Sequence, residues 1–253
     1  MITVAFTVSC LRQRYLRAAI ESWARARGAD QARFLFCLEP PGTFPVGEFT
    51  EYVERVFPGR AMVLQSTVRQ GCLNNTRVAM VQSLAMAADC GEDFGVVTEE
   101  DVEVSDDILE YFTWARDAYR DDLKTVAVCA HTRSSKVEDR EAVVRAAWFA
   151  PLAWGTWQSR WDDVLAPSWG PQEGSNNPES WDNKLKQVIT SGDYRAVFPA
   201  RSRSLHIGEL STLMGTVLGE YVYKASVSDC YSSVYPPGRF FEVPYPEGGL
   251  LWV

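Results

Sequence analysis

The stretch FGVVTEEDVEVSDDILEYF, residues 94–112, joins an apolar run to three consecutive acids. Residues 94–98 predict a buried strand, and Glu99, Glu100 and Asp101 follow directly, with no cation among them. Adjacent carboxylates repel one another and lose hydration wherever they are partly buried. A folded chain usually avoids such a cluster, so its place at the end of a buried strand points to an additional partner.

Three interpretations of this acidic triplet are open on the residues alone. Acidic runs commonly form solvated surface. A calcium loop is the second interpretation, because Glu99, Asp101 and Glu103 alternate, although the glycine and the closing glutamate of an EF-hand are missing. The third is a carboxylate cluster at the carboxyl end of a strand, where open α/β sheets bind ligands. Such a cluster can hold a divalent cation that in turn binds phosphates.

The first half of the chain alternates between strand-like and helix-like segments. Apolar and β-branched runs predict five strands, at 2–8, 33–38, 61–66, 94–98 and 125–130. Helical spacing of apolar residues separates several of them. Runs that are buried on both faces and separated by helices predict an α/β fold, with a mainly parallel sheet and right-handed crossovers.

Two of the predicted helices have a defined apolar side. In the helix predicted over 76–89, one side carries Val78, Val81, Ala85 and Ala88. After the acids, Ser105 or Asp106 can cap a second helix. Its predicted inward stripe consists of Leu109, Phe112 and Tyr119.

Composition narrows the class of protein. With 253 residues, 46% of them hydrophobic, the chain can bury a substantial core, and a net charge of −8 gives no global attraction to nucleic acid or anionic membrane. No window of 18 uninterrupted apolar residues and no signal peptide is evident, so we expect a soluble, cytoplasmic protein without a membrane partner. Six scattered cysteines without a C-x-x-C pair predict reduced core thiols.

The second half of the chain is rich in tryptophan. Six tryptophans lie between residues 148 and 181, with glycine and proline among them and little periodicity. Such rings commonly form core, but rings along a cleft can also provide an apolar floor for a sugar. The turn-rich C-terminal tail, YPPGRFFEVPYPEGGLLWV, predicts a strap over the core.

Several segments, in order along residues 2–216, resemble the inverting GT-A glycosyltransferases of the N-acetylglucosaminyltransferase I type, a family related to protein O-mannose N-acetylglucosaminyltransferase. VVTEEDVEVSDDILEYF is similar to that family's strand, acidic triplet and following helix. The other similar segments are TVSCLRQRYLRAAIESW, FLFCLEPP, WFAPLAWGTW, SWDNKLKQ and ARSRSLHIG.

The resemblance implies a single GT-A (Rossmann-like) domain over 1–253. Residues 1–130 would form the nucleotide-sugar-binding half, and residues 131–253 the half that carries the Trp-rich acceptor region and the catalytic base. The implied cofactor is Mn²⁺ or Mg²⁺, and the implied donor is a UDP-sugar. A hard cation with oxygen ligands neutralises the diphosphate leaving group.

The resemblance also implies roles for residues of the nucleotide-binding half. Asp101, the third acid, matches the ligand to the metal ion. Glu100 and Glu99 would contact the donor, with Glu100 standing where the family usually has Asp. Arg12 matches a basic residue of the first nucleotide loop, and Glu39 matches the acid that accepts the uracil N3–H. A carboxylate there suits a base with an N–H at that edge, which uracil and thymine have, and guanine remains an alternative. Outside this family, Arg12 would be read as a solvated loop residue and Glu39 as a turn residue before two prolines.

Four further residues receive roles in the second half. Asp182 in SWDNKL matches the catalytic base, and Trp181 matches its sugar-contacting neighbour. Taken alone, Asp182 is typical of a helix N-cap or first turn. His206 is a candidate ligand to the metal or the diphosphate, although a lone histidine is commonly structural. Ser211 lies in 208–215, a segment that matches a loop closing over the nucleotide.

The resemblance therefore implies a metal-dependent inverting glycosyltransferase that moves a GlcNAc-like sugar from a UDP-sugar to an acceptor hydroxyl. A chain without anchor or stem suggests a bacterial or phage enzyme acting on a glycan or small molecule, with a modified DNA base as the second choice. Two alternatives are a non-catalytic nucleotide-sugar- or glycan-binding module and a nucleotidyltransferase. The latter lacks support because SCLRQRY, after the first strand, has no glycine for a triphosphate loop.

Overall fold

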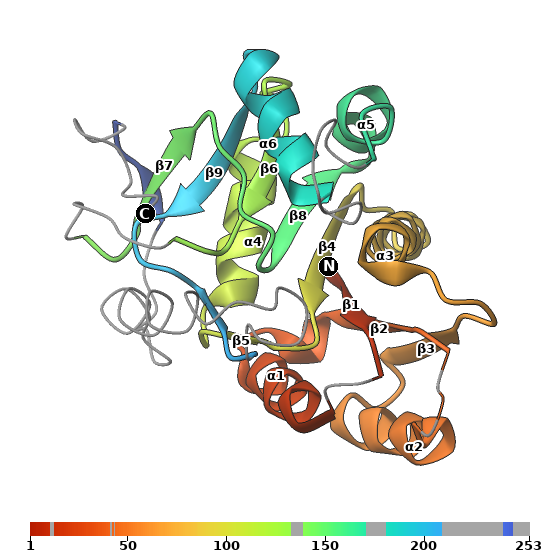
Figure 1. The fold of residues 1–253 in the computed structure, drawn as a ribbon. Helices are drawn as coiled ribbons and strands as arrows, with labels where there is room; N and C mark the ends of the chain where they lie inside the picture. The colour runs from red at the N-terminus through yellow and green to blue at the C-terminus, as the bar shows by residue number, and fades with distance from the viewer. Residues whose placement is uncertain are drawn as a thin grey trace.

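A computed structural model describes residues 1–10, 13–40, 42, 44–132, 139–170, 181–208 and 240–244. The described residues form a large central sheet with helices on both faces (Figure 1). The predicted α/β class with a mainly parallel, helix-flanked sheet is confirmed.

The elements alternate in the first half and become more irregular in the second. The strands are β1 (Thr3–Val8), β2 (Arg33–Leu38), β3 (Ala61–Gln65), β4 (Phe94–Glu99), β5 (Val102–Val104), β6 (Thr125–Cys129), β7 (Ala142–Ala146), β8 (Trp154–Trp157), β9 (Arg195–Pro199), β10 (Ser204–His206) and β11 (Phe241–Glu242). The helices are α1 (Gln13–Arg25), the 3₁₀ turn η1 (Ala29–Gln31), α2 (Val46–Val56), α3 (Gly71–Ala88), α4 (Ile108–Ala118), α5 (Gln158–Arg160), the π-helical segment η2 (Trp161–Leu165) and α6 (Trp181–Ser191).

The described strands pair in the order β11-β7-β9-β6-β8-β4-β1-β2-β3. Strands β3, β2, β1 and β4 are all parallel, and β6 and β9 are parallel to each other. Strand β8 inserts between β4 and β6 and runs antiparallel to both. Because β4 and β6 both oppose β8, they point the same way, and the carboxyl ends of six strands meet at one edge of the sheet. Ligands of open α/β sheets bind at that edge.

The central strands are buried on both faces because each face packs against helices. Along β1, Phe6 lies in the core layer with α1, α2 and α4, while its neighbour Ala5 lies in the layer with α3 and α6. Strand β2 repeats the alternation, with Phe36 stacked on Phe6 at 4.8 Å between ring centroids. A strand covered on both faces reads as a continuous apolar run, which explains why these strands are recognisable in the sequence.

Helix α3 turns the side carrying Val78, Val81, Ala85 and Ala88 to solvent, so these residues do not form its packing face. Its buried residues are instead small or polar at several positions: Asn75, Thr76, Ala79, Met80, Ser83, Leu84, Met86 and Ala87. The reason is the close approach of α3 to β4. A Cβ added at Gly95 would collide with the Ser83 hydroxyl and lie 3.1 Å from the Leu84 amide nitrogen. Small side chains on the facing turn allow this approach.

The inward stripe predicted for α4 is confirmed, since Leu109, Phe112 and Tyr119 are all buried. The residue before this helix is Asp107, whose carboxylate accepts a hydrogen bond of 2.6 Å from the Ser105 hydroxyl. The predicted cap at Ser105 or Asp106 therefore lies one or two residues too early. Neither the Ser105 nor the Asp107 side chain makes a capping bond to the helix backbone in these positions.

The Trp-rich segment is mostly core. Trp154, on β8, stacks on Trp181 with centroids 5.9 Å apart, and Trp181 stacks on Trp169 at 5.2 Å. Gly155 allows β8 to lie against β4, because a Cβ there would be 2.9 Å from the Gly95 carbonyl oxygen.

Among the cysteines of the described residues, Cys10, Cys37 and Cys129 are buried in the core, as predicted, whereas Cys72 and Cys90 are only partly buried. Burial raises the pKa of Cys37 and of Cys129 to about 12, which keeps these thiols protonated at neutral pH. No helix within the described ranges is both long enough and apolar enough to span a bilayer.

The contact between α3 and β4 gives a stability prediction. We expect Gly95→Ala to lower the free energy of unfolding by about 1–3 kcal/mol through overpacking against Ser83 and Leu84. Urea denaturation measures this change. The double variant Gly95→Ala/Ser83→Ala should lose less than the sum of the two single variants, because the colliding hydroxyl is gone.

Gly47→Ala is the matched control for Gly95→Ala. Gly47 lies in α2, and nothing lies within 4 Å of a Cβ added there, so alanine should be neutral or slightly stabilising. Equal unfolding free energies for wild type and Gly95→Ala would contradict the close packing of α3 on β4.

Candidate metal and nucleotide site

Strand ends bring four acidic side chains to one edge of the sheet. Glu99 is the last residue of β4, with Glu100 and Asp101 in the turn that follows. Strand β1 lies between β4 and β2 and is parallel to both, and Glu39 directly follows β2. The predicted nucleotide-binding acids thus come from neighbouring parallel strands at their carboxyl ends.

Glu99, Asp101 and His206 form a cluster that can hold a metal ion. Each offers one ligand atom, and these atoms lie within 4.8 Å of one another. Asp101 is fully buried, at 0% exposure, and its Oδ2 is 3.1 Å from His206 Nε2. Two carboxylates and an imidazole suit Mn²⁺ and related divalent ions. Glu103 is not in this group, so the described residues do not support the alternating calcium loop.

A small second sheet brings His206 to the acids. Strand β10 pairs antiparallel with β5, with His206 opposite Val102, the residue after Asp101. The Ile207 N–H also donates to the Asp101 carbonyl oxygen at 2.9 Å. Backbone pairing therefore joins a residue of the C-terminal half to the acidic triplet, across more than 100 positions of sequence.

Glu100 is held by the end of β1. The Ser9 amide donates to Glu100 Oε2 at 2.7 Å, and the Ser9 hydroxyl donates to Oε1. Glu100 is 1% exposed. Its carboxylate therefore ties the triplet to the loop after β1, in addition to any contact it makes with a donor.

Gly208 lies against Asp101 and His206, two of the three candidate metal ligands. A Cβ there would collide with Asp101 Oδ2 and lie 3.1 Å from His206 Nε2. Only glycine leaves this space beside the two candidate ligands. In the sequence, this glycine stands two residues after a candidate ligand histidine. The reason for a glycine at this position becomes evident only from its contact with Asp101 and His206 in the structure.

Glu39 has one engaged and one open carboxylate oxygen. The backbone N–H of Gln70, at the start of α3, donates to Oε2 at 2.8 Å, whereas Oε1 is buried without a hydrogen-bond partner among the described residues. A buried acceptor usually has a partner, so Oε1 is suited to an N–H from a ligand.

Cys10 reports the electrostatics of this edge. Its thiol donates to the Glu39 carbonyl oxygen at 3.4 Å. Burial raises the pKa of Cys10 to about 12, and the nearby charges of Glu100 and Glu39 contribute in the same direction. The acidic side chains thus make the electrostatic potential at this edge of the sheet negative, which favours binding of a cation.

Asp182 lies in the first turn of α6, after Trp181. Its side chain is 28% exposed, and Oδ2 is 3.5 Å from Lys186 Nζ, one turn further along. Trp181 is 3% exposed and lies between Trp154 and Trp169. Trp181 therefore anchors the start of the helix in the core and leaves Asp182 at the surface.

The tryptophan stack also places the start of α6 at the ligand-binding edge. Trp154 pairs with Val97 of β4, two residues before Glu99. Trp169 donates from its indole nitrogen to the Leu73 carbonyl oxygen at 3.2 Å, in the first turn of α3. Since the first turn of α3 also contacts Glu39, Asp182 belongs to the same edge of the sheet as the acids.

Two predicted site residues, Arg12 and Ser211, lie outside the described residues, as does most of the segment 208–215. His131, for which no role was predicted, is buried at the end of β6. Its Nδ1 is 3.4 Å from both the Ser202 hydroxyl and the Ser204 carbonyl oxygen.

Comparisons with solved structures show the same fold at low sequence identity. Staphylococcus aureus TarS (residues 1–349, in complex with UDP-GlcNAc) aligns with a TM-score of 0.57 and 11% identity, covering 85% of this chain and 62% of TarS. A mannosyltransferase, PcManGT from Pyrobaculum calidifontis, in complex with GDP-Man and Mn²⁺, gives 0.57 and 11%, over 83% and 58% of the two chains. GalNAc-T7 with UDP, GalNAc and Mn²⁺ gives 0.58 and 11%, over 85% and 44%.

These likenesses confirm the GT-A fold predicted for the chain. The chain spans less than two thirds of the length of each of these structures. A search of curated proteins found none that matches. The GNT-I family model matches residues 87–234, more than half of the 253 residues, and this range includes the acidic triplet, Asp182 and His206. The chain therefore belongs to the GNT-I family.

Proposed function

We propose that this chain is a metal-dependent inverting glycosyltransferase that transfers a GlcNAc-like sugar from a UDP-sugar to an acceptor hydroxyl. The observation that carries the proposal is the cluster of Glu99, Asp101 and His206 after β4, at the same edge of the sheet as Glu39, which follows β2 on the other side of β1. Membership of the GNT-I family supports it. Further support comes from the nucleotide sugars and Mn²⁺ in the related folds: UDP-GlcNAc in TarS and GDP-Man with Mn²⁺ in PcManGT.

The three candidate metal ligands are of the types that bind a divalent cation. Asp101 and His206 would supply one oxygen and one nitrogen ligand, and Glu99 a second carboxylate. Gly208 leaves room beside them. When bound, such an ion would supply positive charge that offsets the negative charge of the diphosphate leaving group.

Glu39 would select the base of the nucleotide. Its open Oε1 can accept a hydrogen bond from the N3–H of uracil, while Gln70 holds the other oxygen. Cytosine has an unprotonated N3 at the corresponding edge and would face the carboxylate with a second acceptor. The site therefore favours UDP over CDP.

Asp182 would act as the general base. The acceptor oxygen forms a bond to the anomeric carbon, the bond from that carbon to the diphosphate oxygen breaks, and its electron pair leaves with UDP. The hydroxyl proton passes to Asp182. A single displacement of this kind inverts the anomeric configuration. The buried Trp181 and the ion pair with Lys186 would hold the carboxylate in position.

The metal cluster can be tested without turnover. We expect Asp101→Asn to weaken Mn²⁺ binding by more than about 100-fold in calorimetry, since even outer-shell partners of metal ligands are worth about 10–100-fold. Glu103→Gln, a nearby acid outside the cluster, is the control and should bind Mn²⁺ like wild type. Equal affinities of wild type and Asp101→Asn would exclude this metal site.

The role of Glu39 can be tested by base preference. With Mn²⁺ present, Glu39→Gln should weaken UDP binding by about 10–100-fold, as expected for loss of a hydrogen bond to a charged acceptor. CDP should lose less or gain, because the glutamine amide can donate to N3 of cytosine. Parallel loss for UDP and CDP would show that Glu39 does not read the base.

The role of Asp182 can be tested by kinetics. Asp182→Asn should lower kcat by about 10²–10⁴-fold while the Kd of UDP with Mn²⁺ stays within about twofold. Asp163→Asn, an exposed acid of η2, is the control. NMR of the first-formed product should show the inverted anomer. A wild type that binds UDP-sugar but neither transfers nor hydrolyses it would favour a non-catalytic binding module.

A further inference from the structure

The described part of the C-terminal tail, residues 240–244, docks on the core at the opposite edge of the sheet from β3. Its strand β11 pairs in parallel with β7 (Figure 1). The Glu242 carboxylate accepts a hydrogen bond of 2.8 Å from Arg145 Nε and one of 3.0 Å from the Tyr119 hydroxyl. Backbone and side-chain contacts therefore hold this segment in a defined register, although it lies outside the matched range of residues 87–234.

Phe240 begins the segment and is its one buried residue, at 8% exposure. The centroid of its ring lies 5.5 Å from that of Tyr111 and 5.7 Å from that of Trp114, both on α4. The guanidinium carbon of Arg203 lies over the same ring, 5.4 Å from its centroid. The ring thus links the tail both to α4 and to the residue directly before β10.

Arg203 is a buried junction between several parts of the candidate site. Its guanidinium lies 3.0 Å from the Asp107 carboxylate, and the two side chains are 1% and 3% exposed. Its backbone N–H donates to the Ala130 carbonyl oxygen at 2.8 Å, and its carbonyl oxygen accepts from the Ser105 N–H at 2.9 Å. His206 follows three residues later, at the end of β10. A displacement of Arg203 would therefore shift the start of the strand that carries a candidate metal ligand.

The Phe240 ring stabilises the position of the guanidinium in two ways. It shields one face of the group from water, and the ring electrons attract the cation. The N–H groups of the guanidinium donate to the Asp107 carboxylate and to the carbonyl oxygens of Arg201 and Arg140. Water admitted beside a buried ion pair competes for such hydrogen bonds and allows the arginine other positions. Loss of the ring should therefore loosen the pair.

We propose that Phe240 is a positioning residue for the metal site: its ring holds Arg203 in the buried pair, and Arg203 fixes β10 so that His206 stays beside the acids. This inference rests on the proposed function, because it takes His206 as a ligand to the metal ion. It makes the affinity for the ion depend on a tail segment that has no contact of its own with the three candidate ligands among the printed hydrogen bonds, ion pairs and ring contacts of the described residues.

The first measurement is Mn²⁺ binding to the full chain by calorimetry. Phe240→Leu keeps most of the buried apolar area but has no ring to place over Arg203, so the variant should fold. Its affinity for Mn²⁺ should fall by about three- to tenfold. This is less than the roughly 10–100-fold that outer-shell partners of metal ligands are worth, because Phe240 acts through Arg203. Phe240→Tyr keeps the ring and should stay within about twofold of wild type.

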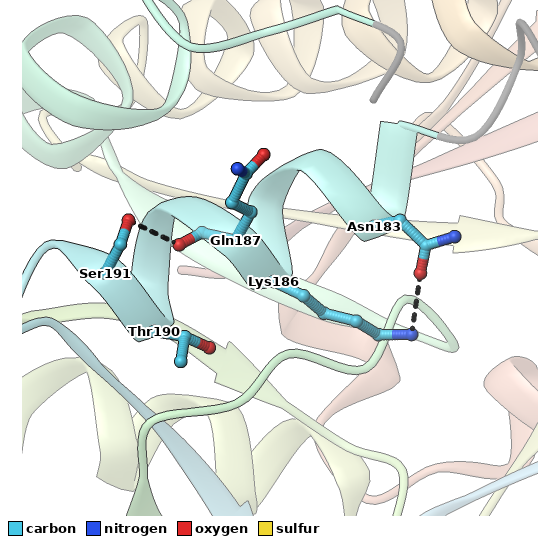
Figure 2. A pocket seen from close by; sticks show the side chains of 5 residues that line it. All are labelled: Asn183, Lys186, Gln187, Thr190 and Ser191. Atoms are coloured by element: carbon cyan, nitrogen blue, oxygen red, sulfur yellow. Dashed lines mark hydrogen bonds between the residues drawn. The ribbon is translucent and has the colours of Figure 1, made fainter. Parts of the chain in front are cut away.

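Phe57→Leu is the matched control. Phe57 is also buried, stacks on Phe34 with centroids 3.8 Å apart, and has the guanidinium carbon of Arg60 at 6.0 Å from its ring centroid. Phe34 lies near the start of β2, whereas the acids follow the ends of the strands. The same substitution there should lower stability without changing the affinity for Mn²⁺. Gln187→Ala, at an open pocket on α6, is the surface control and should match wild type (Figure 2).

Hydrogen exchange of the metal-free protein gives a second readout that does not depend on the ion. The Ile207 N–H donates to the Asp101 carbonyl oxygen at 2.9 Å, so its protection reports whether β10 stays joined to the acids. This amide should exchange about three- to tenfold faster in Phe240→Leu than in Phe57→Leu, because a loosened Arg203 allows β10 to open locally.

The outcomes separate the two proposals. If wild type binds no Mn²⁺, the metal site of the proposed function is overturned, and the positioning role of Phe240 with it. If wild type binds Mn²⁺ but Phe240→Leu and Phe57→Leu bind it equally well, or Ile207 exchanges equally fast in both variants, the role of Phe240 alone is overturned.

Discussion

The burial of the Asp101 carboxylate is the constraint around which the site is arranged. A carboxylate at 0% exposure, next to Glu99 and Glu100, is costly unless its neighbours compensate for lost hydration and mutual repulsion. Different neighbours compensate for the burial and the mutual repulsion of the three acids. Ser9 holds Glu100, His206 faces Asp101, and the three ligand atoms of the cluster converge on one point where a cation can sit. The acids lie together because the strand end, the β1 loop and the β5–β10 pair each contribute a partner.

A second buried pair fixes the position of His206. Arg203, directly before β10, lies 3.0 Å from the Asp107 carboxylate, and both side chains are almost fully buried. The guanidinium also donates to the carbonyl oxygens of Arg201 and Arg140, at 2.7 and 2.8 Å. Such a pair contributes little net stability, but its geometry is demanding and leaves few alternative placements. It therefore ties β10, and with it His206, to the start of α4.

The sequence predicted the parts of the fold in which a pattern is long and buried on both sides. Strand β2 matches its predicted range of 33–38, because RFLFCL is covered by helices on both faces. Helix α3 was predicted, but the assignment of its valines to one side did not reveal that this side faces solvent. The close packing of α3 against Gly95 requires Ser83 and other small residues at the contact. A hydropathy pattern does not predict this, because it records polarity and not side-chain size.

The candidate site shows the same division between local pattern and tertiary contact. The acidic triplet is visible in the sequence because its charge contrasts with the strand before it, and Asp182 was found only through the resemblance of its segment. The three-residue strands β5 and β10 are too short to carry a period, so their pairing could not be predicted from alternation. Ser9 and Gly208 lie in segments that resemble the family, but their contacts are with residues far away in the sequence, so the role of each side chain becomes evident only in the structure.

The stack of Trp154, Trp181 and Trp169 links the two halves of the candidate site through the core. In a single displacement the acceptor oxygen attacks the anomeric carbon from the face opposite the leaving group, so the distance between the proposed base and the proposed metal site has to be held within a narrow range. Rings are suited to this task because they are large and have few rotatable bonds. Trp154 is part of the central sheet, Trp181 begins α6, and Trp169 reaches the first turn of α3. The stack thus connects the helix of Asp182 to the same strand and helix that position Glu99 and Glu39, so the core would set the separation between the proposed base and the proposed metal site.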